Sequence, residues 1–285
     1  MANRPSSDAR RSSAKQARVL IIAGSDSGGG AGIQGDIKTV TALGGYAATA
    51  ITALTAQNTL GVHGVQAVPP DFIRQQIDMV LGDIGADAIK TGMLHSAAVI
   101  DAVCDSLAFH GTSIPLIVDP VMVAKGGASL LDDTAVNTLK TRLIPRAALI
   151  TPNLPEAEAL TGRILRGIDD MRGAAQALLA LGCGAVLLKG GHGEGSVITD
   201  LLAEQGGKVT LFRGRRIDTR HTHGTGCALA SAIATGLAQG LTLHDAVARG
   251  RAYVRKAIVT APGFGTGHGP LNHGHTVRRF GGGRS

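Results

Sequence analysis

Short runs of apolar residues alternate with longer helical segments along most of this chain. Each run is continuous rather than interrupted by a polar residue at every second position, which is typical of strands that are covered on both faces. Strands of this kind pack as a mainly parallel sheet between two layers of helices. The sequence therefore predicts a three-layer α/β sandwich. The expected strands span residues 19–23, 46–56, 86–89, 115–118, 147–150 and 185–188.

The segments between these runs carry the signals of helices. Pro69, Pro70 and Asp71 precede apolar residues at helical spacing, which predicts a helix start at Asp71. Gly206 and Gly207 separate two further strand-like segments and predict a hairpin. The other expected helices span residues 31–43, 97–107, 132–143, 168–181, 225–239 and 243–260, and the hairpin strands span residues 197–202 and 208–212. No repeat or linker divides the chain, so we expect a single domain over residues 19–275.

The formal net charge of +7 comes from the two ends of the chain. Residues 1–18 carry five basic side chains against one acidic side chain, and residues 276–285 carry three basic side chains, which leaves residues 19–275 neutral overall. We expect a disordered basic tail at 1–18 and a flexible basic tail at 276–285. Aromatic residues, on which nucleic-acid bases stack, make up only 2% of the chain. Because the excess of basic residues lies at the two ends and no basic face is indicated on the folded body, the sequence predicts no nucleic-acid partner.

The cysteines and the apolar runs indicate a cellular compartment. Cys104, Cys183 and Cys227 are far apart, odd in number and lack the spacing of a zinc site or a disulfide framework. No apolar run approaches the roughly 20 residues that a membrane-spanning helix needs. Residues 1–18 lack the apolar core of a secretory signal. We therefore expect a cytoplasmic protein that has no membrane partner.

Conspicuous polar side chains follow three of the expected strands. Asp119 comes after the strand at 115–118, Asn153 and Glu156 come after the next one, and Lys189 directly follows the strand at 185–188. In open parallel sheets, ligands bind outside the carboxyl ends of the strands. Glycine-rich turns, one lysine and several acids at this edge indicate a nucleotide and magnesium site.

A turn with the sequence H-T-H-G-T-G-C lies between a basic, strand-like run at 209–217 and a buried helix. The first N–H groups of a helix have no partner within the helix and favour an anion. Gly224 and Gly226 allow the backbone to approach that anion closely. Cys227 lies in the first turn of the helix, where the pKa of a thiol can fall below its usual value. The turn therefore indicates phosphoryl transfer, although a helix entered through glycines with a small buried cysteine explains it equally well.

Two common nucleotide-binding motifs are excluded. Residues 30–35 match G-x-G-x-x-G, but the match begins seven residues after the strand, and no acid occurs between Ile37 and Pro70 to bind a ribose. The pattern G-x-x-x-x-G-K-[ST] of a Walker loop does not occur.

Seven motifs, in order and almost without gaps from about Val19 to His275, closely resemble the hydroxymethylpyrimidine/phosphomethylpyrimidine kinases of thiamine biosynthesis. The motifs are G-S-D-S-G-G-G-A-G-I-Q-G-D-I-K-T, I-T-A-L-T-A-Q-N-T, K-T-G-M-L, V-D-P-V-M-V-A-K, T-P-N-L-P-E-A, L-K-G-G-H and H-T-H-G-T-G-C. The resemblance implies a ribokinase-like fold, a homodimer, and two successive phosphorylations with ATP and Mg²⁺. The first acts on 4-amino-5-hydroxymethyl-2-methylpyrimidine and the second on its monophosphate.

The resemblance also implies which residues bind the pyrimidine. Gln57 matches the residue that reads the ring, and its carboxamide can accept from the 4-amino group and donate to the neighbouring ring nitrogen. Gly24, Asp36, Met93 and Val121 match other positions that line the pyrimidine. Without the resemblance, Gln57 reads as a solvated loop residue, and Met93 and Val121 read as ordinary core.

Other matched residues belong to the phosphate side of the site. Asp119 and Glu156 resemble the family's magnesium region, and Lys189, Asn153 and Thr225 match positions near the nucleotide. Taken alone, Glu156 reads as a favourable acid in the first turn of a helix and Lys189 as a surface lysine at a strand end.

Residues 224–227 match the anion hole of the fold. Gly224, Thr225, Gly226 and Cys227 are therefore the expected catalytic residues. Many enzymes of this fold have an aspartate base where this chain has Cys227, while the pyrimidine kinases tend to carry cysteine. A nearby polyphosphate should raise the pKa of the thiol and oppose the effect of the helix start.

Two other functions remain open from the sequence. A pyridoxal kinase of the same fold would carry similar motifs. A pyrimidine-binding protein without catalysis would keep the fold, although the intact turn together with Asp119, Glu156 and Lys189 argues against it.

Overall fold

A nine-stranded sheet forms the centre of the protein in a computed structural model that describes residues 16–111, 113–122, 131–193 and 195–277. Within these ranges the strand order is β3-β2-β1-β4-β5-β6-β7-β8-β9. The strands from β2 to β7 in this order are parallel, whereas β3 and β8 run antiparallel to their neighbours. The strands are β1 (Arg18–Asp26), β2 (Tyr46–Gln57), β3 (Val62–Ala67), β4 (Ala88–Thr91), β5 (Leu116–Val118), β6 (Leu149–Ile150), β7 (Ala185–Leu188), β8 (Val197–Glu204) and β9 (Val209–Arg215).

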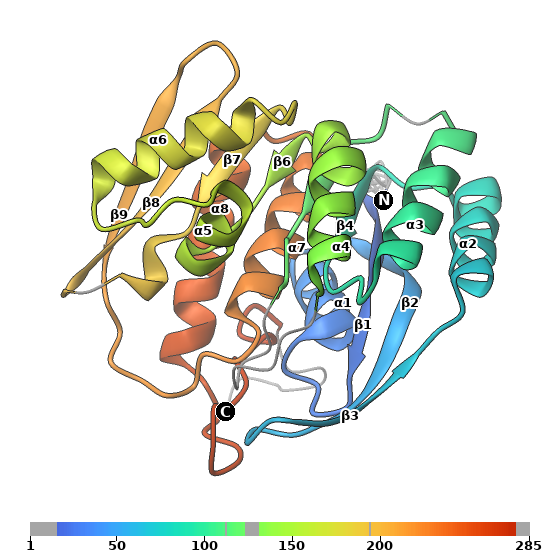
Figure 1. The fold of residues 1–285 in the computed structure, drawn as a ribbon. Coiled ribbons are helices and arrows are strands. Elements are labelled where there is room, and N and C mark those ends of the chain that lie inside the picture. Colours follow the sequence, from blue (N-terminus) through green and yellow to red (C-terminus); the bar gives the residue numbers. More distant parts are fainter. Residues whose placement is uncertain (1–15, 112, 123–130, 194, 278–285) are drawn as a thin grey trace, which may run out of the picture.

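Helices cover both faces of this sheet (Figure 1). Helices α2 to α6 lie on one face, and α1, α7 and α8 lie on the other. The helices are α1 (Gly32–Ala42), α2 (Pro70–Met79), α3 (Ala97–Phe109), α4 (Asp133–Thr138), α5 (Leu154–Thr161), α6 (Ile168–Leu179), α7 (Thr225–Ala238) and α8 (Leu243–Val259). Shorter turns are π-helical at Val80–Ile84 and Leu139–Leu143 and 3₁₀-helical at Ile144–Arg146 and Gly190–His192. The expected three-layer α/β sandwich is confirmed. None of the described helices is long and apolar enough to span a membrane.

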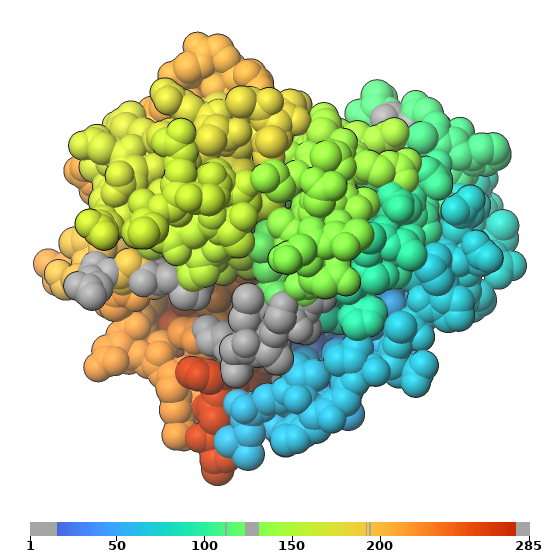
Figure 2. Space-filling view, in the orientation of Figure 1, coloured from blue at the N-terminus to red at the C-terminus, as the bar shows by residue number. Residues whose placement is uncertain are grey.

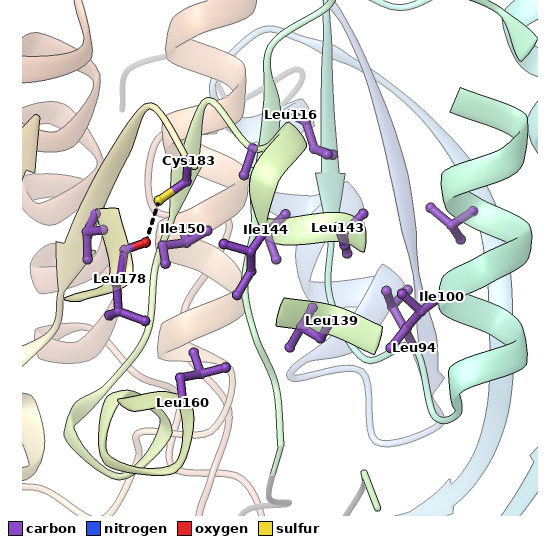
Figure 3. Close-up of a cluster of buried hydrophobic side chains, with 14 of the residues drawn as sticks. Leu94, Ile100, Leu116, Leu139, Leu143, Ile144, Ile150, Leu160, Leu178 and Cys183 are labelled. Atoms are coloured by element: carbon purple, nitrogen blue, oxygen red, sulfur yellow. Dashed lines mark hydrogen bonds between the residues drawn. The ribbon is translucent and has the colours of Figure 1, made fainter. Parts of the chain in front are cut away.

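The two faces of the sheet carry separate apolar cores because successive side chains of a strand point to opposite sides. In β1, Leu20 and Ile22 face α2–α6, whereas Val19 and Ile21 face α1, α7 and α8. Figure 3 shows part of the first core, where Leu residues of the turns after α4 pack between the strands and α3. Each fully buried aliphatic side chain of this kind contributes about 1.5–3 kcal/mol to folding.

Several expected elements agree with the structure and two were missed. The strand at 185–188 and the hairpin of β8 and β9 are confirmed. Strand β3 was missed because it is mostly exposed and its run includes His63, Gly64 and Gln66, so that it has no continuous apolar signal. Helix α5 is the second element that the sequence does not predict, since residues 153–156 indicate only a strand end and a possible first helical turn.

The ends of the expected domain also differ. Strand β1 begins at Arg18, whose guanidinium forms an ion pair of 2.6 Å with Asp87. At the other end, the hydroxyl of Thr276 donates to the carbonyl of Ala42 at 2.6 Å. The strands and contacts that the structure describes therefore begin before residue 19 and continue past residue 275.

The turn before α7 is longer than the sequence suggested. Strand β9 ends at Arg215 and α7 begins at Thr225, so residues 216–224 form a loop between them. This loop passes over the carboxyl ends of the parallel strands, where the polar side chains of the candidate site meet.

Candidate active site

A cavity of about 970 Å³ lies at the carboxyl ends of the parallel strands. Its wall combines the ends of β1, β2 and β4, the starts of α5 and α7, the end of β9 and one side of α8. On the face drawn in Figure 2, a narrow hollow opens between the yellow-green helices and the orange segment below them. The cavity is large enough for a nucleotide together with a second small molecule.

The start of α7 forms one wall of this cavity and requires glycine at its N-cap position. Gly224, the N-cap residue, has φ of 85°, and a Cβ there would lie 1.9 Å from the carbonyl oxygen of Gly30. A Cβ at Gly226 would lie 3.2 Å from Lys189 Nζ and 3.6 Å from Asp119 Oδ2. The backbone N–H groups of Thr225 to Cys227 therefore approach the charged side chains without an intervening side chain, in the arrangement that binds an anion.

Asp119 and Lys189 form an ion pair beneath this turn. Lys189 Nζ donates to Asp119 Oδ1 at 3.0 Å, and the hydroxyl of Thr151 donates to the same oxygen at 2.9 Å. Burial alone would raise the pKa of Asp119, but the Lys189 and Lys90 ammonium groups outweigh it and hold the pKa below its usual value. Asp119 therefore remains charged, and both side chains line the cavity.

Glu156 lies at the start of α5 and forms a capping box with Asn153. Asn153 N–H donates to Glu156 Oε2 at 2.8 Å, and Glu156 N–H donates to Asn153 Oδ1 at 2.9 Å. Burial raises the pKa of Glu156 to about 7, with Asp119 adding to the rise and Lys189 opposing it. The negative charges of Asp119 and Glu156 disfavour each other, and a divalent cation beside them would relieve this repulsion.

The donor set fits Mg²⁺ rather than a metal held wholly by protein. Asp119 and Glu156 supply carboxylate oxygens, which Mg²⁺ prefers. The described residues contain no group of three or more histidine, cysteine, aspartate or glutamate side chains that could hold a metal. A magnesium ion here would therefore take further ligands from phosphates and water, as Mg²⁺ commonly does.

Gln57 ends β2 and lines the same cavity. Its Oε1 accepts from the hydroxyl of Thr55 at 3.2 Å, and its Nε2 lies 3.4 Å from His223 Nε2. The expected pyrimidine-binding residue thus lies beside His223, the residue that precedes Gly224. Gly24, Met93 and Val121 line the cavity as well, and a Cβ at Gly24 would lie 2.4 Å from Met93 Cε.

The structure places Asp36 behind the cavity wall rather than in it. Its carboxylate is fully buried and accepts from Lys90 Nζ and from the hydroxyl of Ser231, each at 2.7 Å. Burial alone would lower the pKa of Lys90, but Asp36 outweighs it and raises the pKa, so the ammonium stays charged. Asp36 therefore influences the site through Lys90, which lines the cavity.

Burial determines the state of the thiol of Cys227. It raises the pKa to about 11, Lys90 opposes the rise, and Asp36 and Asp119 add to it. The effect of the helix start, which favours a lower pKa, is therefore outweighed. The thiol is therefore protonated at neutral pH.

Three residues of the site, His223, Asp26 and Lys90, are not indicated by the sequence as functional candidates. His223 Nε2 donates to Asp26 Oδ2 at 2.7 Å, and Asp26 also accepts from the N–H groups of Gly28, Gly30 and Ala31. An aspartate followed by glycines often accepts from the next backbone N–H groups, and this signal could have identified Asp26. The pairing with His223 spans 197 residues and has no local signal.

Comparisons with known proteins agree with this geometry. Residues 26–272 match the family model described as phosphomethylpyrimidine kinase. The chain is 51% identical over 257 residues to the hydroxymethylpyrimidine/phosphomethylpyrimidine kinase of Bacillus subtilis, covering 90% of this chain and 94% of that one. It is 52% identical over 264 residues to the thiamine biosynthesis bifunctional protein ThiED of Geobacter sulfurreducens, covering 93% of this chain but only 54% of that longer protein.

Solved structures show the same fold. The pyridoxal kinase from Staphylococcus aureus in complex with AMP-PCP and pyridoxal superposes with a TM-score of 0.84 at 32% identity, covering 92% of this chain and 95% of that one. The fold is thus the ribokinase-like sandwich that the motifs implied. With a family model that spans most of the residues and a relative at 51% identity, this chain belongs to the phosphomethylpyrimidine kinase family.

Proposed function

We propose that this protein is an ATP-dependent kinase that phosphorylates 4-amino-5-hydroxymethyl-2-methylpyrimidine and then its monophosphate, in thiamine diphosphate biosynthesis. The observation that carries the proposal is that one cavity contains both Gln57 and the turn from Gly224 to Cys227, with Lys189 and Asp119 beside that turn. A pyrimidine held by Gln57 would present its hydroxymethyl group to the end of the cavity where the N–H groups at the start of α7 would bind an anion.

The residues of the chain would bind and orient both reactants. Gln57 would hydrogen-bond the 4-amino group and ring nitrogen, while Met93 and Val121 would contact the ring. Lys189 and the N–H groups of Thr225 to Cys227 would bind the phosphate oxygens that gain charge during transfer, which is the main protein contribution in phosphoryl transfer. The acceptor oxygen would then attack the terminal phosphorus of ATP, ADP would leave, and the proton of the alcohol would pass to water, or to Cys227 in the small fraction of molecules in which its thiol is deprotonated.

We further propose Mg²⁺ as the metal and ATP as the phosphoryl donor. Asp119 and Glu156 would hold the ion, which would neutralise phosphate charge, and Asn153, Lys189 and Thr225 would lie near the nucleotide. The ATP analogue AMP-PCP bound to the pyridoxal kinase of the same fold supports the choice of nucleotide.

A homodimer in the cytoplasm completes the proposal. The three cysteines are free, and Cys104 and Cys183 are buried thiols, which fits a reducing compartment. The homodimer follows from the family resemblance and is tested by the mass of the protein in solution.

Pyridoxal phosphorylation is the second candidate function, because the structural likeness to pyridoxal kinase is high. A coupled assay of ADP release should be run with the hydroxymethylpyrimidine and with pyridoxal, followed by mass analysis of the products. We expect mono- and diphosphorylated pyrimidine and a much lower turnover of pyridoxal. Turnover of pyridoxal alone would establish the second function, and ADP release with neither compound would contradict both.

A further inference from the structure

The segment at 263–275, which follows α8, contacts three separate parts of the candidate site. It meets the turn after β2, the loop before α7 and the glycine-rich loop after β1, as the next paragraphs describe. It lies far from all three in sequence, and none of its side chains was assigned a role above.

The first contact is with the turn that follows Gln57. His268 N–H donates to the carbonyl of Thr59 at 2.8 Å, and Gly267 N–H donates to the hydroxyl of Thr59 at 3.3 Å. A Cβ at Gly267 would lie 2.1 Å from the Thr59 carbonyl oxygen, so the two backbones are in direct contact. The segment thereby supports the end of β2.

The second contact is with the loop that leads into α7. His223 N–H donates to the carbonyl of Gly269 at 3.2 Å, and Pro270 pairs with His223 as a parallel bridge. His223 directly precedes Gly224, so the backbone of the segment holds the residue at which the anion-binding turn begins.

The third contact is made by the side chain of His273, which is only 5% exposed. Its Nε2 lies 3.1 Å from the carbonyl oxygen of Gly30, and its Nδ1 lies 3.2 Å from the hydroxyl of Thr39. Because a carbonyl can only accept, Nε2 carries the hydrogen. Nδ1 faces the hydroxyl of Thr39, which donates to the carbonyl of Gly35 at 2.8 Å. The hydroxyl of Tyr253 on α8 donates to the carbonyl of His273 at 2.7 Å and fixes its backbone.

Gly30 connects His273 to the turn. The carbonyl that accepts from His273 is the same one that a Cβ at Gly224 would meet at 1.9 Å. A Cβ at Gly30 would in turn lie 2.6 Å from His223 Cδ2 and 3.0 Å from Pro270 Cβ. A shift of Gly30 would therefore shift Gly224 and the N–H groups that follow it.

We propose that His273 is a positioning residue for phosphoryl transfer: it holds the carbonyl of Gly30, and Gly30 sets the position of Gly224 and the anion-binding N–H groups. The proposal rests on the kinase function proposed above, and it extends that site to a residue 46 positions after Cys227 that does not touch the reactants.

Two substitutions of His273 separate the hydrogen bond of Nε2 to Gly30 from the contact of Nδ1 with Thr39. His273→Gln places an amide nitrogen where Nε2 lies and keeps the donor to Gly30, whereas His273→Asn reaches only the position of Nδ1 and Thr39. Both variants are neutral and similar in size. We expect His273→Asn to lower kcat at least about tenfold, since small misplacements of catalytic groups have effects of this order. We expect the KM for the pyrimidine to change less than about twofold and His273→Gln to restore most of kcat.

Deuterium exchange of the amides at 222–229 gives a readout that does not depend on activity. These amides should exchange faster in His273→Asn than in the wild type, and at the wild-type rate in His273→Gln. Equal kcat and equal exchange in the two variants would overturn the proposal, whether both match the wild type or both fall. If the wild type does not phosphorylate the pyrimidine, the kinase proposal fails, while the exchange experiment still decides whether His273 positions the turn.

Discussion

The environment of Cys227 shows how opposing effects decide the chemistry of one residue. A helix start and the Lys90 ammonium favour the thiolate, but burial and the nearby carboxylates of Asp36 and Asp119 outweigh them and raise the pKa to about 11. A phosphoryl transfer with a loose transition state needs little help from a base, because positioning and charge stabilisation dominate. A base that is present in only a small fraction of the molecules at neutral pH, as the Cys227 thiolate is, is therefore compatible with the proposed reaction.

Cys227→Ala should slow the first phosphorylation more than the second. The hydroxymethyl group must lose a proton during transfer, whereas the monophosphate is largely ionised at neutral pH because its second pKa is about 6. The two rates can be measured separately on purified protein with each acceptor. Equal losses in both steps would argue for a purely structural role of the thiol.

At the scale of the element, the start of α7 depends on its contact with the loop after β1. The backbone at Gly224 is left-handed and lies against Gly30, and the side chain of His223 lies against Asp26 in the same loop. The loop and the helix start are thus a single unit that is formed by segments about 200 residues apart.

Gly224→Ala should abolish phosphoryl transfer, and Gly240→Ala is its matched control at the other end of α7. Both glycines have nearly the same φ, 85° and 83°, so both substitutions cost about 1–2 kcal/mol of backbone strain. Only at Gly224 would the new Cβ meet another backbone, because nothing lies within 4 Å of a Cβ at Gly240. We expect kcat to fall at least about 100-fold in Gly224→Ala and to stay near the wild-type value in Gly240→Ala. Similar kcat values for the two variants would contradict the role of this contact.

His273 should make the stability of the protein sensitive to acid. Burial lowers its pKa to about 4, whereas in the unfolded chain it titrates at about 6.5. Between these two pH values the unfolded chain binds the proton and the folded protein does not. The free energy of unfolding therefore falls as the pH drops from about 6.5 to about 4. Below about pH 4 both states bind the proton, and His273 causes no further loss of stability. The loss is at most roughly 3 kcal/mol.

Urea unfolding of the wild type and of His273→Gln at pH 7 and pH 4.5 measures this effect. The wild type should lose more stability between the two pH values than the variant, which has no titrating group at this position. Parallel losses would assign the acid sensitivity to other groups.

At the scale of the whole molecule, the sequence predicted what depends on local pattern. The apolar runs located most of the parallel strands, and the rule that strand ends meet at one edge brought Asp119, Asn153 and Lys189 together. Asp36 matched a pyrimidine-lining position, but the rotation of α1 turns its side chain towards Lys90 and Ser231. The contacts of His223 with Asp26 and of His273 with Gly30 span 197 and 243 residues, and no periodicity encodes pairings of that range.

Removal of both basic ends should leave catalysis intact, because we propose that the kinase domain lies within the part of the chain that forms the sheet and the helices. The cut should spare Arg18, which pairs with Asp87 at the start of β1, and Thr276, which bonds to Ala42. A chain of residues 16–277 meets both conditions. It lacks seven basic side chains and one acidic side chain of the full sequence, so its formal net charge falls from +7 to +1.

The truncated and full-length proteins should therefore have the same kcat and KM at physiological ionic strength, since no charge from the ends is needed in the cavity. They should differ in retention on a cation-exchange column, which responds to the lost charge. A large increase in the KM for ATP that disappears at high salt would instead show that the basic ends attract the nucleotide from a distance. A fall in kcat that salt does not change would place part of the catalytic machinery outside residues 16–277.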